Sequence, residues 1–172
     1  MEIKIRGVEA KDKDAIESII RDNENFTDEE RYCAVELLDI YLKDLSPNVS
    51  IGETVKGEYI FVCAADETDK PLGYVCYGNA PFTDGVYDMY WIAVDPPWQG
   101  KRVGKMLIKH LENILKHENA RMIIAETSSQ PKYDKARLFY EKSGFMEASR
   151  IKDFYRVGDD KIVYIKQLKG AS

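Results

Sequence analysis

The stretch of residues 86–117 constrains the fold more than any other part of this sequence. Residues 86–94 are apolar and aromatic, as in a strand, and Pro96 and Pro97 end that strand because proline cannot donate to a β-ladder. Residues 101–117 then show the clearest helical periodicity of the chain, with one apolar stripe. The stripe comprises Val103, Met106, Leu107, His110, Leu111, Ile114 and Leu115. A strand, a glycine-bearing loop and an amphipathic helix in this order predict an α/β fold.

Periodic patterns before and after this stretch predict the other elements. Alternating or short apolar runs predict strands over residues 2–8, 59–65, 72–77, 121–125, 147–155 and 161–168. Apolar residues at helical spacing predict helices over residues 14–21, from Thr27 onwards and over 133–142. Thr27 and Glu30 have the spacing of a capping box, and residues 47–57 are expected to form a loop. The inward face of the second helix is expected to be Ala34, Leu38, Tyr41, Leu42 and Leu45.

Length and composition are those of one soluble globular domain. The chain has 172 residues, of which 44% are hydrophobic and 32% charged, so it is neither disordered nor fibrous. With 25 Lys and Arg against 30 Asp and Glu, the formal net charge is -5. General nucleic-acid binding needs a basic face and is therefore not expected, while cationic partners are mildly favoured.

Targeting and metal-binding patterns are absent from the sequence. The beginning of the chain has no apolar core of a signal peptide, and the longest apolar run, residues 59–65, is far shorter than the ~20 residues of a membrane helix. Cys33, Cys63 and Cys76 have no metal-binding spacing, and both histidines lie in one helical segment. We therefore expect a cytoplasmic protein without a metal site and without a membrane or nucleic-acid partner.

The loop between the strand and the helix has the properties of an anion site. Free backbone N–H groups and the positive end of a helix dipole suit a phosphate or pyrophosphate. The loop is Gln99-Gly100-Lys101-Arg102-Val103-Gly104-Lys105. Three residues separate Gly100 from Gly104, and Met106 follows Lys105, whereas a Walker A loop needs four residues and a Ser or Thr. A P-loop NTPase is therefore excluded, and the G-x-G-x-x-G dinucleotide fingerprint is absent too.

Two motifs in the right order resemble those of one family, the GNAT superfamily of acetyl-CoA-dependent N-acetyltransferases. The segment Ile92-Ala93-Val94-Asp95-Pro96, followed by residues 99–104 and a helix, is similar to the Q/R-x-x-G-x-G/A motif that binds acetyl-CoA. Residues 136–145 are similar to the family's A-x-x-x-Y-e-k-x-G-F segment. The resemblance covers nearly the whole chain, because the order of strands and helices also matches.

The resemblance implies a fold and a cofactor. The expected fold is α/β, with a single mixed, mostly antiparallel twisted sheet of about seven strands flanked by about four helices. The sheet is expected to split where the strand at 86–94 meets the strand at 121–127. Backbone groups of Ile92, Ala93 and Val94 would hold the acetyl and pantetheine parts of acetyl-CoA, with an N–H near Val94 as oxyanion donor. The loop at 99–105 would hold the pyrophosphate.

This chain departs from the family pattern at two positions. Arg102 stands where the family usually has its first glycine, so we expect a loop built with ordinary dihedrals, since positive φ is unfavourable for Arg. Its guanidinium could reach a CoA phosphate instead. Tyr133 stands where an Asn is frequent, and we include it among the cofactor-binding residues.

Acyl transfer from a thioester to an amine needs a base for the amine and an acid for the leaving thiolate. Tyr140 matches the general acid of many members, and a phenol with a pKa near ~10 keeps its proton at neutral pH. Glu126 matches the base of members that acetylate protein N-termini, where partial burial would raise its pKa. Asp88 matches the base position of the histone-acetylating branch, and a water relay is a third option.

These features predict a single domain over residues 1–172 that transfers an acetyl group from acetyl-CoA to a primary amine of a small molecule, amino acid or peptide. A non-catalytic acyl-CoA-binding regulatory module on the same fold is the alternative, although it would need neither Tyr140 nor Glu126. Another acyl-CoA or a hydroxyl acceptor stays open. The acceptor, the acyl chain preference and the oligomeric state, a homodimer included, cannot be deduced from the sequence.

Overall fold

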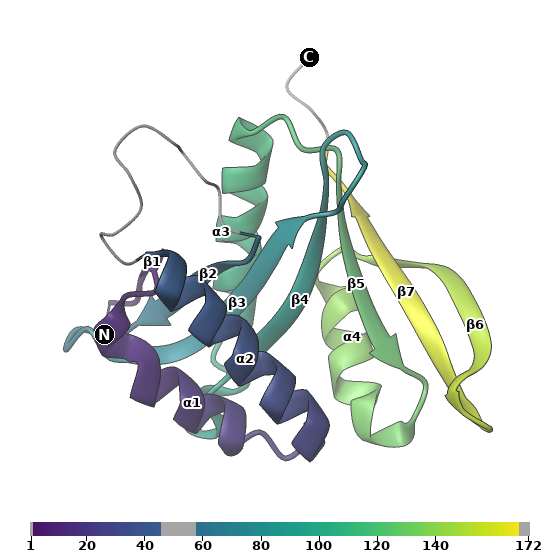
Figure 1. The fold of residues 1–172 in the computed structure, drawn as a ribbon, viewed down its shortest axis with the longest axis horizontal. Coiled ribbons are helices and arrows are strands. Elements are labelled where there is room, and N and C mark those ends of the chain that lie inside the picture. Colours follow the sequence, from purple (N-terminus) through teal and green to yellow (C-terminus); the bar gives the residue numbers. More distant parts are fainter. Residues whose placement is uncertain (1, 46–57, 169–172) are drawn as a thin grey trace. The chain divides into compact units, whose positions relative to one another are not determined.

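The strands form one seven-stranded mixed sheet with the order β1-β2-β3-β4-β5-β7-β6 in a computed structural model that describes residues 2–45 and 58–168 (Figure 1). The strands are β1 (Lys4–Gly7), β2 (Ile60–Ala65), β3 (Pro71–Asn79), β4 (Val86–Val94), β5 (Met122–Ser128), β6 (Met146–Arg156) and β7 (Asp159–Gln167). The helices are α1 (Lys13–Arg21), α2 (Asp28–Asp44), α3 (Val103–His117) and α4 (Asp134–Lys142). Short 3-10 turns are η1 (Ala10–Asp12), η2 (Pro96–Trp98) and η3 (Pro131–Tyr133).

Strand pairing confirms the expected fold class. The pairs β1–β2, β2–β3, β5–β7 and β6–β7 are antiparallel, whereas β4 and β5 are parallel. The register of β4 and β5 runs from Val86 opposite Met122 to Met89 opposite Ala125, which is less than half of β4. The single mixed sheet with four α-helices is the architecture that the sequence predicts.

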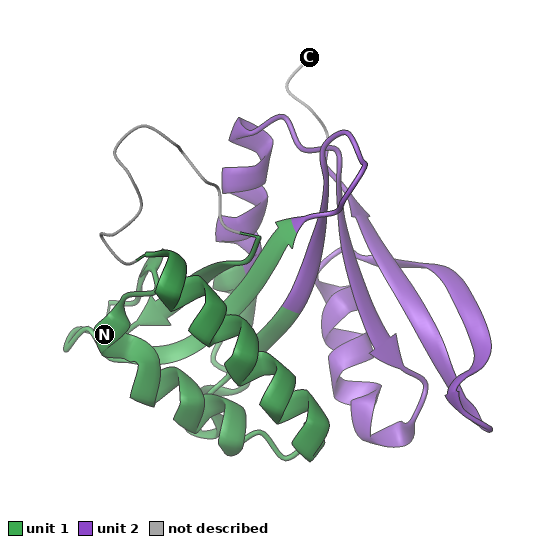
Figure 2. Cartoon of the chain, viewed as in Figure 1, with its two compact units in different colours: residues 1–78, 91–107 green, residues 79–90, 108–172 purple. Residues whose placement is uncertain are grey.

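The chain divides into two compact units (Figure 2). Unit 1 contains residues 1–78 and 91–107, and unit 2 contains residues 79–90 and 108–172. Strand β4 and helix α3 each contribute residues to both units. The single domain over the whole chain stays a prediction.

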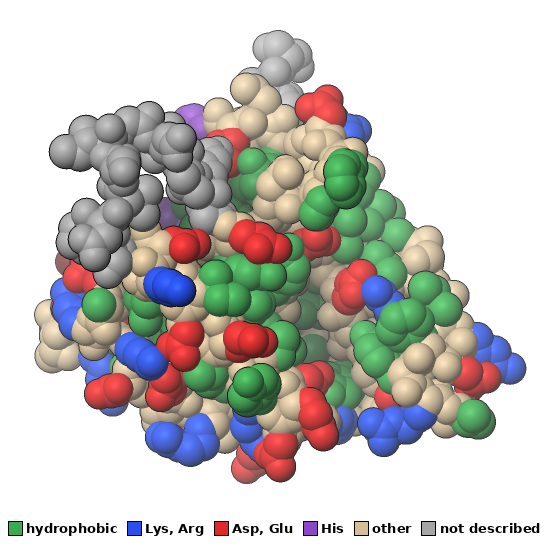
Figure 3. Space-filling view, in the orientation of Figure 1, with side chains coloured by type: hydrophobic (Ala, Val, Ile, Leu, Met, Phe, Trp, Pro, Cys, Tyr) green, Lys and Arg blue, Asp and Glu red, His purple; other side chains and the backbone are tan. Residues whose placement is uncertain are grey.

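In unit 1, α1 and α2 lie side by side on one face of the strands (Figure 1). The capping box of α2 is confirmed, because the Thr27 hydroxyl accepts from the Glu30 N–H and the Glu30 carboxylate accepts from the Thr27 N–H. The Tyr41 ring contacts Phe61 of β2 at 5.3 Å between centroids. Over the region of α1 and α2, acidic and basic side chains are interspersed (Figure 3). This face therefore presents no continuous basic surface in that view.

The expected core of α2 is correct in its middle and wrong at its end. Ala34 and Leu38 are fully buried, whereas Leu45 is 53% exposed. Helix α2 ends at Asp44, so Leu45 is its C-cap and lies beyond the last turn that faces the strands. Leu37 is buried although the periodicity did not predict it. The predicted loop at 47–57 lies outside the described residues.

In unit 2, an aromatic cluster joins α4 to β7. Tyr140 contacts Tyr164 and Phe145 at 5.6 and 5.7 Å between ring centroids. Leu111 and Leu115 of α3 are buried, as the apolar stripe predicts. Ile108 is buried as well, although it was not assigned to the stripe. Among the described residues, none of the helices has both the length and the apolar character needed to cross a membrane.

Candidate active site

The loop after β4 is a tight turn in unit 1. The 3-10 turn η2 is closed by hydrogen bonds from the Trp98 N–H to the Asp95 carbonyl, at 2.7 Å, and from the Gln99 N–H to the Pro96 carbonyl, at 3.2 Å. A further turn follows, in which the Lys101 N–H donates to the Trp98 carbonyl at 3.3 Å. The Gln99 side chain donates to the Val94 carbonyl at 3.1 Å, which ties the loop back to the end of β4. Helix α3 then begins at Val103. The loop N–H groups after the turn are thus held at a helix N-terminus, where an anion is favoured.

Arg102 corrects the expectation of ordinary dihedrals, because its φ is +69° and that of Gly100 is +74°. Two left-handed residues bracket Lys101 and turn the chain from η2 into α3. The Met106 N–H donates to the Arg102 carbonyl at 3.0 Å, so Arg102 already supplies the first turn of α3. The helix and the turn therefore impose a conformation that would suit glycine, although this chain has Arg there.

Replacing Arg102 with Gly should keep or raise the melting temperature. Relief of the left-handed strain gains about 1–2 kcal/mol, and the extra freedom of Gly in the unfolded chain offsets about 0.4–1 kcal/mol of it. A thermal melt of Arg102→Gly beside the wild type checks this expectation. Because Arg102→Ala retains the strain and loses the guanidinium, it is the matched control. A clearly lower melting temperature in the Gly variant would show that the side chain stabilises the fold.

The end of β4 needs a glycine on the neighbouring strand, a residue that sequence reasoning missed. A Cβ added to Gly73 of β3 would lie 2.9 Å from the Ala93 carbonyl and 3.2 and 3.3 Å from Val94 and Val103. The absent side chain lets β3 approach the Ile92-Ala93-Val94 segment and the start of α3. An isolated glycine inside a strand pattern signals such a close approach, so Gly73 could have been found. Ala93 itself is buried.

Unit 2 brings the two candidate carboxylates onto one face of the sheet. Asp88 pairs with Ile124, and Glu126 follows two residues later on β5, hence on the same face. Glu126 is 47% exposed, and the Lys161 Nζ lies 2.6 Å from its Oε2. The Glu126 side chain is therefore about half exposed, with a cation at its carboxylate. Burial instead raises the pKa of Asp88, to which the nearby Glu126 charge adds and which the Lys161 charge opposes.

Tyr140 lies in unit 2 on the opposite face of the sheet from these carboxylates. Its ring packs on Tyr164, which pairs with Ala125, and Ala125 points away from the face of Glu126. Tyr140 is only 9% exposed. Burial, together with the neighbouring Tyr164, raises the pKa of Tyr140 to about 12, above the ordinary phenol value that the sequence suggested. The hydroxyl therefore keeps its proton over the whole neutral range.

Tyr133 lies at the start of α4, where it ends η3 and occupies the N-cap position. Its ring is half-buried and is covered by the Lys132 ammonium at 4.6 Å from the centroid. Tyr133 thus occupies the position at the start of this helix where the family frequently has Asn. Its role in cofactor binding stays a prediction.

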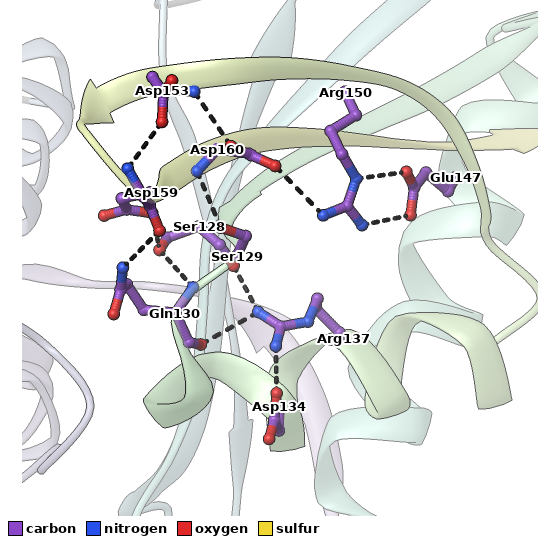
Figure 4. A network of polar contacts seen from close by, with 11 residues as sticks. Ser128, Ser129, Gln130, Asp134, Arg137, Glu147, Arg150, Asp153, Asp159 and Asp160 are labelled. Atoms are coloured by element: carbon purple, nitrogen blue, oxygen red, sulfur yellow. Dashed lines mark hydrogen bonds and ion pairs between the residues drawn. The ribbon is translucent and has the colours of Figure 1, made fainter.

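A polar network fixes the end of β5 to the β6–β7 hairpin and to α4 (Figure 4). The Ser128 hydroxyl donates to buried Asp159 at 2.5 Å and accepts from the Gln130 N–H at 3.0 Å. Arg137 of α4 donates to the Ser128 and Gln130 carbonyls at 2.5 and 3.1 Å. Glu126 is two residues before Ser128, so its strand is anchored at that end. Sequence reasoning gave Arg137 no separate role, since its partners are backbone carbonyls at the end of β5 and in the loop that follows.

Within the described ranges, 2–45 and 58–168, no cluster of three or more His, Cys, Asp or Glu side chains could hold a metal ion. The residues of the anion loop and of the β4 end lie in unit 1, whereas Asp88, Glu126, Tyr133 and Tyr140 lie in unit 2. Unit 1 thus contains the candidate cofactor-binding loop, and unit 2 contains the candidate proton-transfer groups.

Comparisons with known proteins define the family. Residues 17–145 match the model of the acetyltransferase (GNAT) family. A GNAT-family acetyltransferase structure from Desulfovibrio desulfuricans is 35% identical, with a TM-score of 0.86, and the match covers 98% of this chain and 100% of that one. The chain therefore belongs to the GNAT family of acetyltransferases. It is a GNAT-type N-acetyltransferase.

More distant structures share the fold. The ribosomal-protein-S18-alanine N-acetyltransferase of Escherichia coli is 18% identical with a TM-score of 0.70, and the match covers 99% of this chain and 97% of that one. An aminoglycoside 6'-N-acetyltransferase complexed with coenzyme A is 16% identical with a TM-score of 0.70, covering 98% and 99% of the two chains. No curated protein sequence matches the chain. The acceptors named for these two structures, a protein and a small molecule, differ from each other in kind.

Proposed function

We propose that the protein transfers the acetyl group of acetyl-CoA directly to a primary amine of a small molecule, amino acid or peptide. The observation that carries this proposal is the placement of carboxylates and Tyr140 on opposite faces of β5 and β7. An amine attacking a thioester loses a proton on its own side, while the sulfur needs a proton on the side from which it leaves. A base and an acid on opposite faces suit these two demands.

The reaction consists of addition and elimination. The amine nitrogen attacks the thioester carbon, and Glu126 takes a proton from that nitrogen. The C–S bond then breaks with its electron pair on sulfur, and the Tyr140 hydroxyl gives its proton to the CoA thiolate. Solvent returns a proton to Tyr140 and removes one from Glu126 before the next cycle. The products are an amide and coenzyme A.

The cofactor is proposed to bind through unit 1, with Tyr133 of unit 2 as a further candidate contact. The loop at residues 99–105 would hold the pyrophosphate through N–H groups at the start of α3, aided by Lys101, Arg102 and Lys105. The N–H groups of Gln99 and Lys101 already donate to Pro96 and Trp98 and shape the loop instead. Backbone groups of Ile92, Ala93 and Val94 would hold the acetyl and pantetheine parts, with the oxyanion at an N–H near Val94. The close approach of Gly73 to Ala93 supports a fixed backbone there.

A panel of amines, amino acids and peptides with acetyl-CoA, followed by release of the free thiol, tests the proposed acceptor class. We expect at least one amine to consume acetyl-CoA and yield its amide, as confirmed by mass spectrometry. Release of thiol only with alcohols, or only from a different acyl-CoA, would contradict the amine acceptor or the acetyl donor. The localisation of the protein in the cytoplasm is tested separately by fractionation.

With the amine from that panel, Glu126→Gln should lower kcat by about 10²-fold or more, because the side chain loses its basicity while keeping its size. Asp88→Asn is the matched control on the neighbouring strand, and we expect a smaller loss from it. Steady-state kinetics of both variants checks the assignment. A larger loss in Asp88→Asn would identify Asp88 as the base, and wild-type rates in both would favour a water relay.

A further inference from the structure

Lys161 lies in unit 2 on the face of the sheet that contains Asp88 and Glu126. It lies on β7 opposite Ser128 of β5 and opposite Ile151 of β6. Its Nζ is 2.6 Å from the Glu126 Oε2, and its side chain is only 17% exposed. Ser128 and Glu126 alternate with buried Thr127, so the lysine points to the same face as the proposed base. The ammonium therefore contacts one of the two oxygens through which Glu126 would act.

An irregular hairpin places an aromatic ring over this cation. The register of β6 and β7 shifts between Ile151 and Arg156, and Phe154 lies in the extra segment. The Lys161 Nζ is 4.9 Å from the centroid of the Phe154 ring. Asp153 has a φ of +53° and accepts a 2.6 Å hydrogen bond from the Gly158 N–H, while its own N–H donates to Asp160 (Figure 4).

This arrangement differs from an ordinary surface ion pair. An exposed pair contributes little because both side chains move freely and water screens them. Here the ammonium contacts a carboxylate and also lies over an aromatic ring, and the hairpin is fixed to the end of β5 by Ser128 and Asp159. Hydrophobic side chains gather on the surface over this hairpin region (Figure 3). The lysine is held in place relative to Glu126.

We propose that Lys161 is a positioning residue for acetyl transfer, one that holds the Glu126 carboxylate in a fixed orientation towards the amine. The proposal rests on the proposed function, in which Glu126 takes the proton of the amine. Holding Oε2 with Lys161 leaves Oε1 to accept that proton. A cation at this place also disfavours the protonated form of an incoming amine, since two positive charges repel, and the neutral amine is the nucleophile.

The charged groups of this face come from three strands. Asp88 lies on β4, Glu126 on β5 and Lys161 on β7. Lys161 opposes the effects that raise the pKa of Asp88, which are burial and the Glu126 charge. On β6, Arg150 is paired with Glu147 and, across the hairpin, with Asp160. Without the lysine, burial and the Glu126 charge would act on Asp88 unopposed, and the pKa of Asp88 would rise further.

The test measures the steady-state kinetics of acetyl transfer for Lys161→Met, with the amine found in the panel. Lost orientation should lower kcat by about 10-fold or more. The KM for acetyl-CoA should stay at its wild-type value, because Lys161 is not among the residues proposed to bind the cofactor. Lys161→Arg keeps the charge and should restore most of the wild-type kcat. Lys152→Met, an exposed lysine of the same hairpin, is the matched control and should match the wild type.

The outcomes separate this proposal from the proposed function. If the wild type acetylates no amine, the proposed function fails. If the wild type is active and Lys161→Met has the wild-type kcat, the role of Lys161 alone is wrong. A loss of kcat that Lys161→Arg does not restore, or one accompanied by a raised KM for acetyl-CoA, would indicate a merely structural role. If Lys161→Met does not fold, Phe154→Leu, which uncovers the ammonium, should lower kcat by a smaller factor; a wild-type kcat there overturns the proposal.

Discussion

Replacing Tyr140 with Phe should lower kcat by about 10²- to 10⁴-fold, the range of lost general-acid catalysis, while acetyl-CoA binds as before. The ring and its packing against Tyr164 and Phe145 are kept, so the substitution removes only the hydroxyl. Without that proton, the CoA thiolate must leave unprotonated or take its proton from solvent. Steady-state kinetics and a titration with CoA, on both proteins, separate the chemical step from binding.

The pH dependence of kcat in the wild type and in Tyr140→Phe gives a second test, because the direction of each change can be predicted. The pKa of Tyr140 is raised to about 12, so the kcat of the wild type should not fall at moderately alkaline pH through loss of this proton. The deficit of Tyr140→Phe should shrink towards low pH, where solvent protonates the thiolate more readily, as long as the amine acceptor still loses its proton. A wild-type kcat in the Phe variant would remove Tyr140 from the mechanism and leave it as a core residue.

The order of strands and helices was predictable because each element has its own period in the sequence. Helix α3 and strand β4 have strong patterns, and the predicted starts of α2 and α4 differ from the observed ones by a residue at most. Errors occur where a pattern ends rather than where it repeats. Leu45 continues the apolar spacing of α2 but follows the last helical residue, since spacing alone does not show where a helix stops.

The conformation of Arg102 shows how tertiary structure overrides a local preference. The left-handed region is unfavourable for Arg by about 1–2 kcal/mol. Hydrogen bonds of η2 before it and of α3 after it fix the path of the chain, and their sum exceeds that preference. The family motif, with glycine at this position, was a better guide to φ than the residue itself. The preference of a single residue does not predict φ here, because the hydrogen bonds of the neighbouring residues fix the turn.

The surroundings of Glu126 could not be predicted, for a different reason. Its partner Lys161 is far away in the sequence, and only the register of β5 and β7 brings them together. A shift by one residue would move Lys161 to the other face of the sheet. The sequence alone thus identifies Glu126 as a carboxylate at the end of a strand, but neither its exposure nor its ion pair. The burial of Tyr140 could not be predicted either, because it depends on Tyr164, which lies on a later strand.

Gly104→Glu should abolish the rise in melting temperature that acetyl-CoA causes in the wild type. A ligand at 100 times its Kd stabilises the folded state by about 2.7 kcal/mol. The introduced carboxylate would lie in the first turn of α3, where the pyrophosphate is proposed to bind, and would repel it. The same helix dipole favours a Glu at this position in the free protein, so the variant should fold with an unchanged or slightly higher melting temperature.

Thermal melts of Gly104→Glu and Gly104→Gln, each with and without acetyl-CoA, check this prediction. Gln has nearly the size of Glu without its charge, so a partial rise in the Gln variant would assign the loss to charge repulsion. Loss in both variants would mean that a side chain of this size blocks the anion loop by its volume. A full rise in Gly104→Glu would place the pyrophosphate elsewhere, because a fixed negative charge at the start of α3 cannot leave a phosphate bound there unaffected.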